Sequence, residues 1–367
     1  MRCSLYLSPR SRRPSDQLPL IRLLLEQAAQ ADAAGFEAIV LTEHHLSSHN
    51  PYQNSLLFAA SIAQRIERAH IILATINPAI HQPLRLVESC NLLDQLLGGR
   101  FIIGFGPGFV DDEYRAFGRD PAERVKLFET SLQVALDLWG FADGAAPFDY
   151  VAGGERGRID RPVVPAPFRS PHPLFARATL TDATIVDTAR KGWPVFVGKW
   201  DAPETARRLA PYHDALARSG HDPEVVATAR RWTGTMKWIH VAETDAEARS
   251  HVEASIGRWL GAPHGDQPAG TPGRASGDDH AVPETASSDR SGAKGDPASL
   301  RSSQIICGSP ATVAAELERY AAAGVGQMMC NFVRDLDEAD AVRRSFALFC
   351  SDVLPLFASD PEPALAI

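Results

Sequence analysis

Short apolar runs alternate with amphipathic stretches along almost the whole chain, and this alternation limits the possible folds more than any other feature. The apolar runs predict strands at residues 2–8, 36–41, 70–76, 100–105, 173–176, 194–198, 232–241 and 325–332. A helical pattern follows each strand, and strand–helix units in series form a parallel sheet covered by helices. Eight such units in 367 residues favour a single-domain α/β fold, a closed (β/α)8 TIM barrel with insertions, over an open doubly wound sheet.

Two segments interrupt the alternation. Residues 140–172 are rich in Gly and Pro, and we expect a loop with short strands that forms an insertion over the barrel mouth. Residues 261–303 are crowded with small and polar residues, and Val282 and Leu300 are their only large aliphatic side chains. Such a segment buries too little apolar surface to offset its ordering entropy. It is expected to be disordered or to form a mobile lid within the domain, or to be a tolerated surface insertion.

Composition narrows the class of protein. The net charge of −8 gives no sign of a nucleic-acid or acidic-membrane partner. The five cysteines are scattered without a C-x-x-C pair, as in a reduced cytoplasmic protein. No apolar run reaches the roughly 18 residues that a transmembrane helix needs. The first residues predict a strand and not a signal peptide.

The triplet Glu43-His44-His45 directly follows the buried strand 36–41. The carboxyl ends of parallel barrel strands form the mouth where catalytic groups sit. An imidazole titrates near neutral pH, so His44 is the predicted catalytic acid or base, with His45 more structural. Glu43 could orient a ring or bond to buried backbone amides. The alternative is a pair of polar loop residues, one of them bonded to a backbone carbonyl.

A metal site is the main rival for the histidines. Adjacent residues such as His44 and His45 rarely bind the same ion, and neither His81 nor His240 stands at a recognised ligand spacing from them. We therefore predict no metal.

Four other residues indicate a bound ring and a phosphate. Gly106 lies in a glycine-rich loop after strand 100–105, where backbone could approach a flat ring or simply turn. Thr181 and Thr184 open a helix, where hydroxyls and free amides form an anion site, although plain N-capping by Thr181 needs no ligand. Arg124 is either a second phosphate ligand or a solvated helix charge.

Taken together, the motifs resemble the bacterial luciferase-like family of flavin-dependent monooxygenases. The resemblance rests on residues 35–45, Asn91-Leu92-Leu93-Asp94-Gln95, Gly99-Arg100-Phe101, Phe117-Gly118, Gly308-Ser309-Pro310 and residues 348–355. It covers nearly the whole chain, 1–367, apart from the two interrupting segments. It implies a (β/α)8 barrel that holds a reduced flavin at its carboxyl-terminal mouth.

The resemblance also assigns residues. His44 matches the catalytic histidine of the family, and Thr181, Thr184 and Arg124 match its phosphate contacts. Glu43, His45, Ala74, Thr75 and Gly106 complete the predicted cofactor-binding set. The family often has a cis peptide that would here join Ala74 and Thr75.

Two positions depart from the luciferases, which carry a reactive cysteine at the position of Gly106 and an arginine at that of Pro107. The first change is expected to open space beside the ring and argues against light emission. The second removes a phosphate contact.

The implied function is an FMNH2-dependent, two-component monooxygenase. It would use O2 through a flavin C4a-(hydro)peroxide to oxidise an aldehyde, a ketone or an aromatic compound. Trp238 is the candidate for an apolar wall of the pocket. A separate flavin reductase would supply FMNH2, and a cytoplasmic homodimer is expected. The alternatives are an F420-dependent oxidoreductase on the same barrel and a non-catalytic partner subunit.

Overall fold

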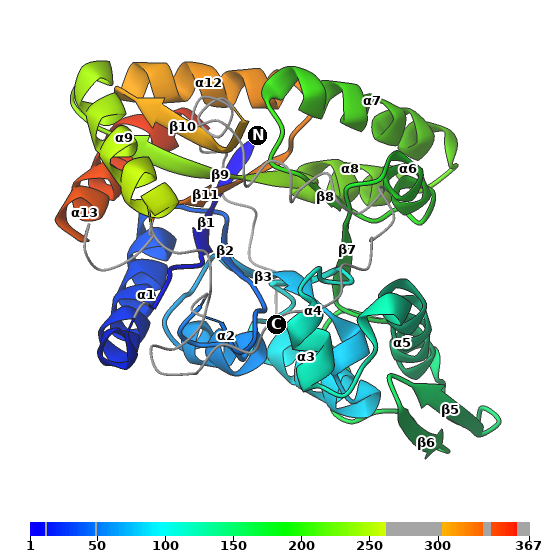
Figure 1. Ribbon diagram of the computed structural model, residues 1–367. Helices are drawn as coiled ribbons and strands as arrows, with labels where there is room; N and C mark the ends of the chain where they lie inside the picture. Colours follow the sequence, from blue (N-terminus) through cyan, green and yellow to red (C-terminus); the bar gives the residue numbers. More distant parts are fainter. Residues whose placement is uncertain (12, 48–49, 262–302, 333–338, 358–367) are drawn as a thin grey trace.

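Eight parallel strands close into a barrel in the computed structural model, which describes residues 1–11, 13–47, 50–261, 303–332 and 339–357 (Figure 1). The barrel strands are β1 (Arg2–Leu7), β2 (Ala38–Leu41), β3 (His70–Ile76), β4 (Phe101–Phe105), β7 (Leu174–Ala178), β8 (Val195–Val197), β9 (Gly234–Val241) and β11 (Gln327–Asn331). Strand β9 pairs with both β8 and β11, which closes the ring. The predicted (β/α)8 TIM barrel is confirmed.

Helices surround this barrel. They are α1 (Pro14–Ala34), α2 (Ser55–Ala63), α3 (Pro83–Leu96), α5 (Arg124–Gly140), α6 (Asp182–Arg190), α7 (Ala202–Arg218), α9 (Asp245–Gly261), α12 (Pro310–Ala322) and α13 (Ala339–Leu348). The residues at the helix ends determine where the helices stop. Helix α1, for example, stops where Gly35 adopts a φ of 98°, a conformation that glycine enters without steric cost. No helix in the described ranges has the length and apolarity to cross a membrane.

Alternate strand residues divide the core into two layers. Inside the barrel lie Ala38, Val40, Ile72, Ile102, Ala176, Phe196, Trp232 and Met329. Their neighbours along the strands, such as Ile39 and Phe175, pack outward against the helices. This is the period of two expected of strands that are buried on both faces.

Gly104 shows how tightly the barrel interior is filled. A Cβ atom on Gly104 would lie 2.5 Å from the Phe196 ring and 2.6 Å from the Leu73 carbonyl oxygen. We expect Gly104→Ala to lower the free energy of unfolding by about 1–3 kcal/mol, since overpacking forces ring and backbone to shift. Urea unfolding measures the effect. Gly140→Ala is the matched control, because a Cβ there meets nothing within 4 Å; equal stability of both variants would contradict the packing argument.

Three elements were not predicted from the sequence. Helices α4 (Asp111–Ala116) and α8 (Pro223–Trp232) lie in stretches for which we predicted no element. The four-residue strand β10 (Ile305–Gly308) pairs with the carboxyl-terminal half of β9. Trp232, expected to begin a strand, instead ends α8. Helix α4 buries only Glu113 and Tyr114, so it carries no apolar stripe that a periodicity analysis could detect.

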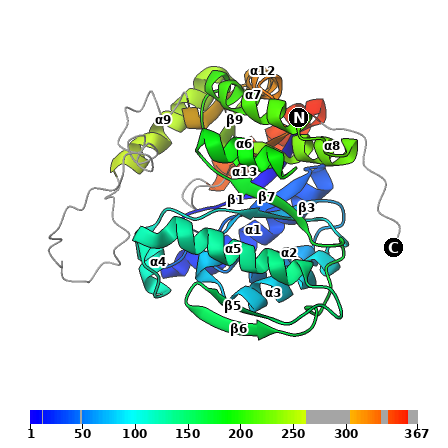
Figure 2. The same cartoon turned by 90° about the vertical axis from the view of Figure 1, so that its right-hand side faces the viewer.

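The insertion at 140–172 forms an antiparallel hairpin of β5 (Phe148–Ala152) and β6 (Glu155–Ile159). The hairpin lies outside the ring of helices, beyond α5 (Figures 1 and 2). Gln82 Nε2 donates to the Tyr150 hydroxyl over 2.8 Å, and Asn91 Nδ2 donates to the Pro165 carbonyl over 2.7 Å. The hairpin thus contacts the amino-terminal end of α3, where Gln82 is the N-cap residue, and Pro165 bonds to the middle of that helix. Cover of the barrel mouth by this insertion stays a prediction. The lid expected at 261–303 falls, except for its two end residues, outside the described residues.

Candidate active site

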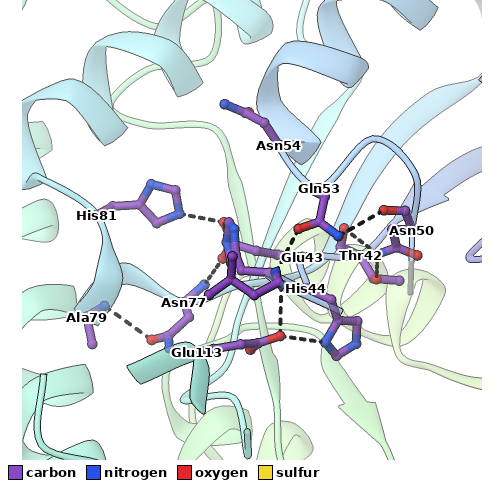
Figure 3. A network of polar contacts seen from close by, with 12 residues as sticks. Thr42, Glu43, His44, Asn50, Gln53, Asn54, Asn77, Ala79, His81 and Glu113 are labelled. Atoms are coloured by element: carbon purple, nitrogen blue, oxygen red, sulfur yellow. Dashed lines mark hydrogen bonds and ion pairs between the residues drawn. The ribbon is translucent and has the colours of Figure 1, made fainter. Parts of the chain in front are cut away.

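Glu43 is the buried anchor of the polar triplet that follows β2. Its side chain is only 4% exposed. One carboxylate oxygen accepts the Asn77 amide over 2.9 Å, and the other lies 2.6 Å from His81 Nε2 and 3.4 Å from His45 Nε2 (Figure 3). Asn77 and His81 belong to the loop after β3, so Glu43 ties the ends of two neighbouring barrel strands together. The bond to a backbone amide is one of the roles that the sequence suggested.

The contact between Glu43 and His81 favours the ionised form of both side chains. Burial alone would raise the pKa of Glu43, but the charge of His81 and the hydrogen bonds from His45, His81 and the Asn77 amide lower it to about 2. Burial lowers the pKa of His81, yet the Glu43 carboxylate outweighs it and raises that pKa above its ordinary value. Glu43 is thus a permanent anion and not a proton carrier at neutral pH.

His44 is held by a second carboxylate, Glu113 of α4. His44 Nδ1 lies 3.1 Å from Glu113 Oε1, and the His45 amide donates to the same oxygen over 2.9 Å (Figure 3). The Glu113 side chain is 10% exposed. A carboxylate at Nδ1 favours the tautomer with its proton there, which leaves Nε2 as the basic nitrogen of the ring. The arrangement fixes the orientation of the His44 ring through its Nδ1 atom.

Glu113 was not among the residues predicted from the sequence. The residue lies in the acidic run Asp111-Asp112-Glu113, which resembles an ordinary first helical turn. The available signal was its position, because this run directly follows the loop that leaves barrel strand β4. Acidic residues after a barrel strand lie at the mouth, as the triplet after β2 does.

Thr75 and Gly106 lie against each other at the ends of β3 and β4. A Cβ atom on Gly106 would be 3.0 Å from Thr75 Oγ1 and 3.2 Å from its Cγ2. We expected from the sequence that the missing side chain at Gly106 leaves open space. The structure shows that Thr75 fills this space. The peptide that joins Ala74 to Thr75 is cis, as the resemblance implied.

The predicted phosphate residues begin α6. The Thr181 hydroxyl donates to Thr184 Oγ1 over 2.8 Å; Thr181 is exposed and Thr184 is half-buried. Thr181 occupies the N-cap position without a side-chain capping bond. The plain-capping alternative is therefore wrong. Thr184 also lines a surface hollow of about 320 Å³ between α5 and α6, with Glu129, Arg177 and Lys191 among its walls.

Arg124 begins α5 with a partner already in place. Its guanidinium pairs with Asp111 and lies 5.4 Å from the centre of the Tyr114 ring. The Tyr114 hydroxyl in turn donates to the Pro107 carbonyl over 2.5 Å. The solvated-charge alternative does not fit, since the Arg124 side chain is only 18% exposed. Its contact with a phosphate stays a prediction.

The chain matches a known protein family over most of its length. Residues 1–327 match the model of the luciferase-like monooxygenases. The chain belongs to the luciferase-like monooxygenase family. The family includes flavin-dependent enzymes, and the resemblance seen in the sequence motifs is confirmed. Within the described ranges, no group of three or more His, Cys, Asp or Glu side chains is arranged to hold a metal ion.

Curated relatives share part of the chain. Limonene 1,2-monooxygenase of Rhodococcus erythropolis is 32% identical over 129 residues, 35% of this chain and 33% of that protein. The alkanal monooxygenase alpha chain of the Kryptophanaron alfredi symbiont is 31% identical over 116 residues, 31% of this chain and 32% of that protein. The chain thus spans about a third of the length of each relative.

Solved structures share the fold over nearly the full length. Monooxygenase RslO1 of Streptomyces bottropensis superposes with a TM-score of 0.78 at 21% identity, over 98% of this chain and 100% of that one. The oxygenating constituent of 3,6-diketocamphane monooxygenase of Pseudomonas putida, solved with FMN, gives 0.72 at 18% identity, over 98% and 99%. An F420-dependent secondary alcohol dehydrogenase gives 0.67 at 14% identity, over 98% and 99%.

Proposed function

We propose that this protein is an FMNH2-dependent monooxygenase that transfers one atom of O2 to a small organic substrate. A separate reductase would supply the reduced flavin, and the enzyme would act as a homodimer. The observation that carries the proposal is the His44 imidazole, fixed by Glu113 at the mouth end of a barrel strand. A ring nitrogen oriented in this way is suited to move a proton during oxygen transfer.

The residues at the mouth fit a flavin mononucleotide. The amides of the first turn of α6 and the hydroxyls of Thr181 and Thr184 form an uncapped helix start, which favours a phosphate. Gly106 and Thr75 offer backbone and a hydroxyl for a ring edge. Bound reduced FMN would supply the activation of dioxygen. The chain itself would orient the ring, exclude water and hold a proton at His44.

Removing both hydroxyls tests the phosphate site. We expect Thr181→Ala combined with Thr184→Ala to weaken FMN binding roughly tenfold or more, because two hydrogen bonds to a charged group are lost. Riboflavin, which lacks the phosphate, should bind the variant and the unchanged protein equally, and calorimetry measures both ligands. Thr244→Ala is the control, since that hydroxyl accepts the Glu247 amide at the start of α9. An unchanged ratio of FMN to riboflavin affinity would contradict the assignment.

The reaction type is tested with photoreduced FMN and isotopically labelled dioxygen. The proposal expects one labelled oxygen atom in the product of an aldehyde or ketone, and a slower return of oxidised-flavin absorbance than in buffer. Hydride transfer with F420 and no oxygen uptake would favour the alcohol dehydrogenase type of chemistry instead. Activity that appears only after a homologous chain is added would favour a partner subunit.

A further inference from the structure

Two inward-facing polar side chains, Tyr6 and Asn331, lie next to each other on β1 and β11. The ladder between these strands pairs Leu5 with Cys330, so the next position on each strand brings Tyr6 beside Asn331. On its other side, Asn331 is paired with Trp238 of β9. Alternation along each strand points all three side chains into the barrel. Three neighbouring strands therefore place Trp238, Asn331 and Tyr6 in one row on the inner wall.

Solvent reaches the upper part of this wall. Inward side chains lower in the barrel, such as Ile72 and Ala176, are fully buried. Two residues further along the same strands, Ala74 and Ala178 are half-buried, and so is Tyr6. The interior of the barrel is thus packed below and accessible above, so a ligand that enters at the mouth can reach the row.

Asn331 and Tyr6 lack the hydrogen bonds that buried polar groups usually make. Asn331 is 3% exposed, and its Oδ1 atom accepts no hydrogen bond from any residue that the structure describes. The Tyr6 hydroxyl likewise has no hydrogen-bond partner in the described ranges, and burial raises its pKa. The phenol therefore keeps its proton at neutral pH and can donate it to a hydrogen bond. An unpaired buried acceptor is costly and rare in folded proteins.

The polar side chains one layer nearer the mouth are bonded to one another. The Ser8 hydroxyl donates to Asn50 Oδ1 over 2.8 Å, and Asn50 Nδ2 donates to the Thr42 hydroxyl. Inward polar groups of this layer thus find their partners within the chain. The missing partner of Asn331 points instead to a group that a ligand supplies.

The row lies across the barrel from the residues that we assign to the flavin. In the ring β1-β2-β3-β4-β7-β8-β9-β11, strand β11 is opposite β4, and β1 is opposite β7. Thr75 and Gly106 are at the ends of β3 and β4, and the proposed phosphate site follows β7. A flavin on that side leaves Tyr6 and Asn331 to the second reactant, the organic substrate.

We propose that the organic substrate carries a hydroxyl group on an aromatic ring, and that this hydroxyl donates to Asn331 Oδ1 and accepts from the Tyr6 hydroxyl. This inference rests on the proposed monooxygenase function and specifies its substrate class. A hydroxyl is the smallest group that makes both bonds, whereas a simple aldehyde, ketone or ether has no proton for Asn331. The rings of Tyr6 and Trp238 on either side of Asn331 favour a flat aromatic body.

Calorimetry on the full chain saturated with FMN tests this with 2-naphthol and 2-methoxynaphthalene. The second probe keeps the rings and the acceptor oxygen but has no O–H to donate. 2-Naphthol should bind at least about tenfold more tightly, because the ether leaves Asn331 unpaired. Asn331→Leu should weaken 2-naphthol binding roughly tenfold and bind both probes about equally, and Tyr6→Phe should weaken it roughly fivefold. FMN affinity should stay unchanged in both variants.

Thermal unfolding separates a binding role from a structural one. Asn331→Leu removes a buried acceptor without a partner, so the variant should unfold roughly 2 °C higher than the unchanged protein. Tyr212→Phe is the control, because the Tyr212 hydroxyl donates to the Trp193 carbonyl over 2.8 Å outside the barrel. That variant should unfold at a lower temperature and bind 2-naphthol as the unchanged protein does.

Equal affinity of the unchanged protein for both probes, or unchanged 2-naphthol affinity in both Asn331→Leu and Tyr6→Phe, would overturn the inference. A tenfold loss of FMN affinity in either variant would also overturn it, since the row would then bind the flavin. The monooxygenase proposal would survive these results if labelled oxygen still enters a product. Binding of 2-naphthol that depends on Asn331, without labelled oxygen in any product, would overturn the proposed function and leave the hydroxyl site in place.

Discussion

Replacing His44 by alanine is expected to lower the rate of oxygen transfer about a thousandfold, with little change in FMN affinity. A positioned acid–base group contributes roughly a hundredfold to ten-thousandfold to a proton-transfer step. Because the imidazole is held through Nδ1 by Glu113, the loss should appear in kcat and not in KM. Steady-state kinetics with photoreduced FMN and an apolar aldehyde measure both constants. Glu113→Gln should give an intermediate loss in kcat, since the amide keeps an acceptor for the His45 N–H but loses the charge.

The control for this variant is a histidine far from the mouth. His221 contacts the Ala189 carbonyl at the opposite end of α6, and His221→Gln should leave the rate unchanged. A His44→Ala enzyme that keeps its full rate would show that His44 is structural. The same holds if KM rises and thermal stability falls while kcat stays unchanged.

Replacing Glu43 by glutamine is expected to destabilise the fold by about 3 kcal/mol near pH 5–6. The pKa of Glu43 is about 2 in the folded protein and 4.5 ordinarily, so its contribution is present above pH 4.5 and lost as pH falls toward 2. The pKa of His81 is raised, so its contribution is complete below 6.5 and is lost as pH rises through the raised value. The difference in stability between the unchanged protein and Glu43→Gln should therefore be largest above pH 4.5 and below pH 6.5.

Urea unfolding of both proteins from pH 2 to 8 measures this difference. Glu318→Gln, an exposed glutamate of α12, is the control and should change stability by no more than about 0.5 kcal/mol at any pH. A Glu43→Gln difference that does not vary with pH would contradict the buried ion pair as the source of its effect.

The barrel was predictable because its determinants are local. Strands such as 70–76 and 100–105 are continuous apolar runs, and helices such as α3 begin and end at recognisable proline and glycine signals. The insertion at 140–172 was harder, because its polar partners are far away in the sequence: Gln82 bonds to Tyr150 of the hairpin, and Asn91 bonds to Pro165. Nothing in residues 140–172 themselves indicates which part of α3 they contact.

The candidate site was also predictable only in part. The triplet was visible because two imidazoles and an acid follow a buried strand. Glu113 was not, because its partner His44 is 69 residues away and its own helix has only six residues. Thr75 and Gly106 lie at the ends of two different strands. The sequence shows that Gly106 has no side chain, but not that Thr75 occupies the space beside it.

A crystal structure of the protein with bound FMN tests the central claim most directly. We predict the isoalloxazine ring across the mouth of the barrel, with an edge against Thr75 and Gly106, the His44 imidazole within hydrogen-bonding reach of the reacting face, and the phosphate on Thr181 and Thr184. A flavin bound elsewhere on the molecule, or a ring at the mouth that His44 cannot approach, would contradict the proposed chemistry.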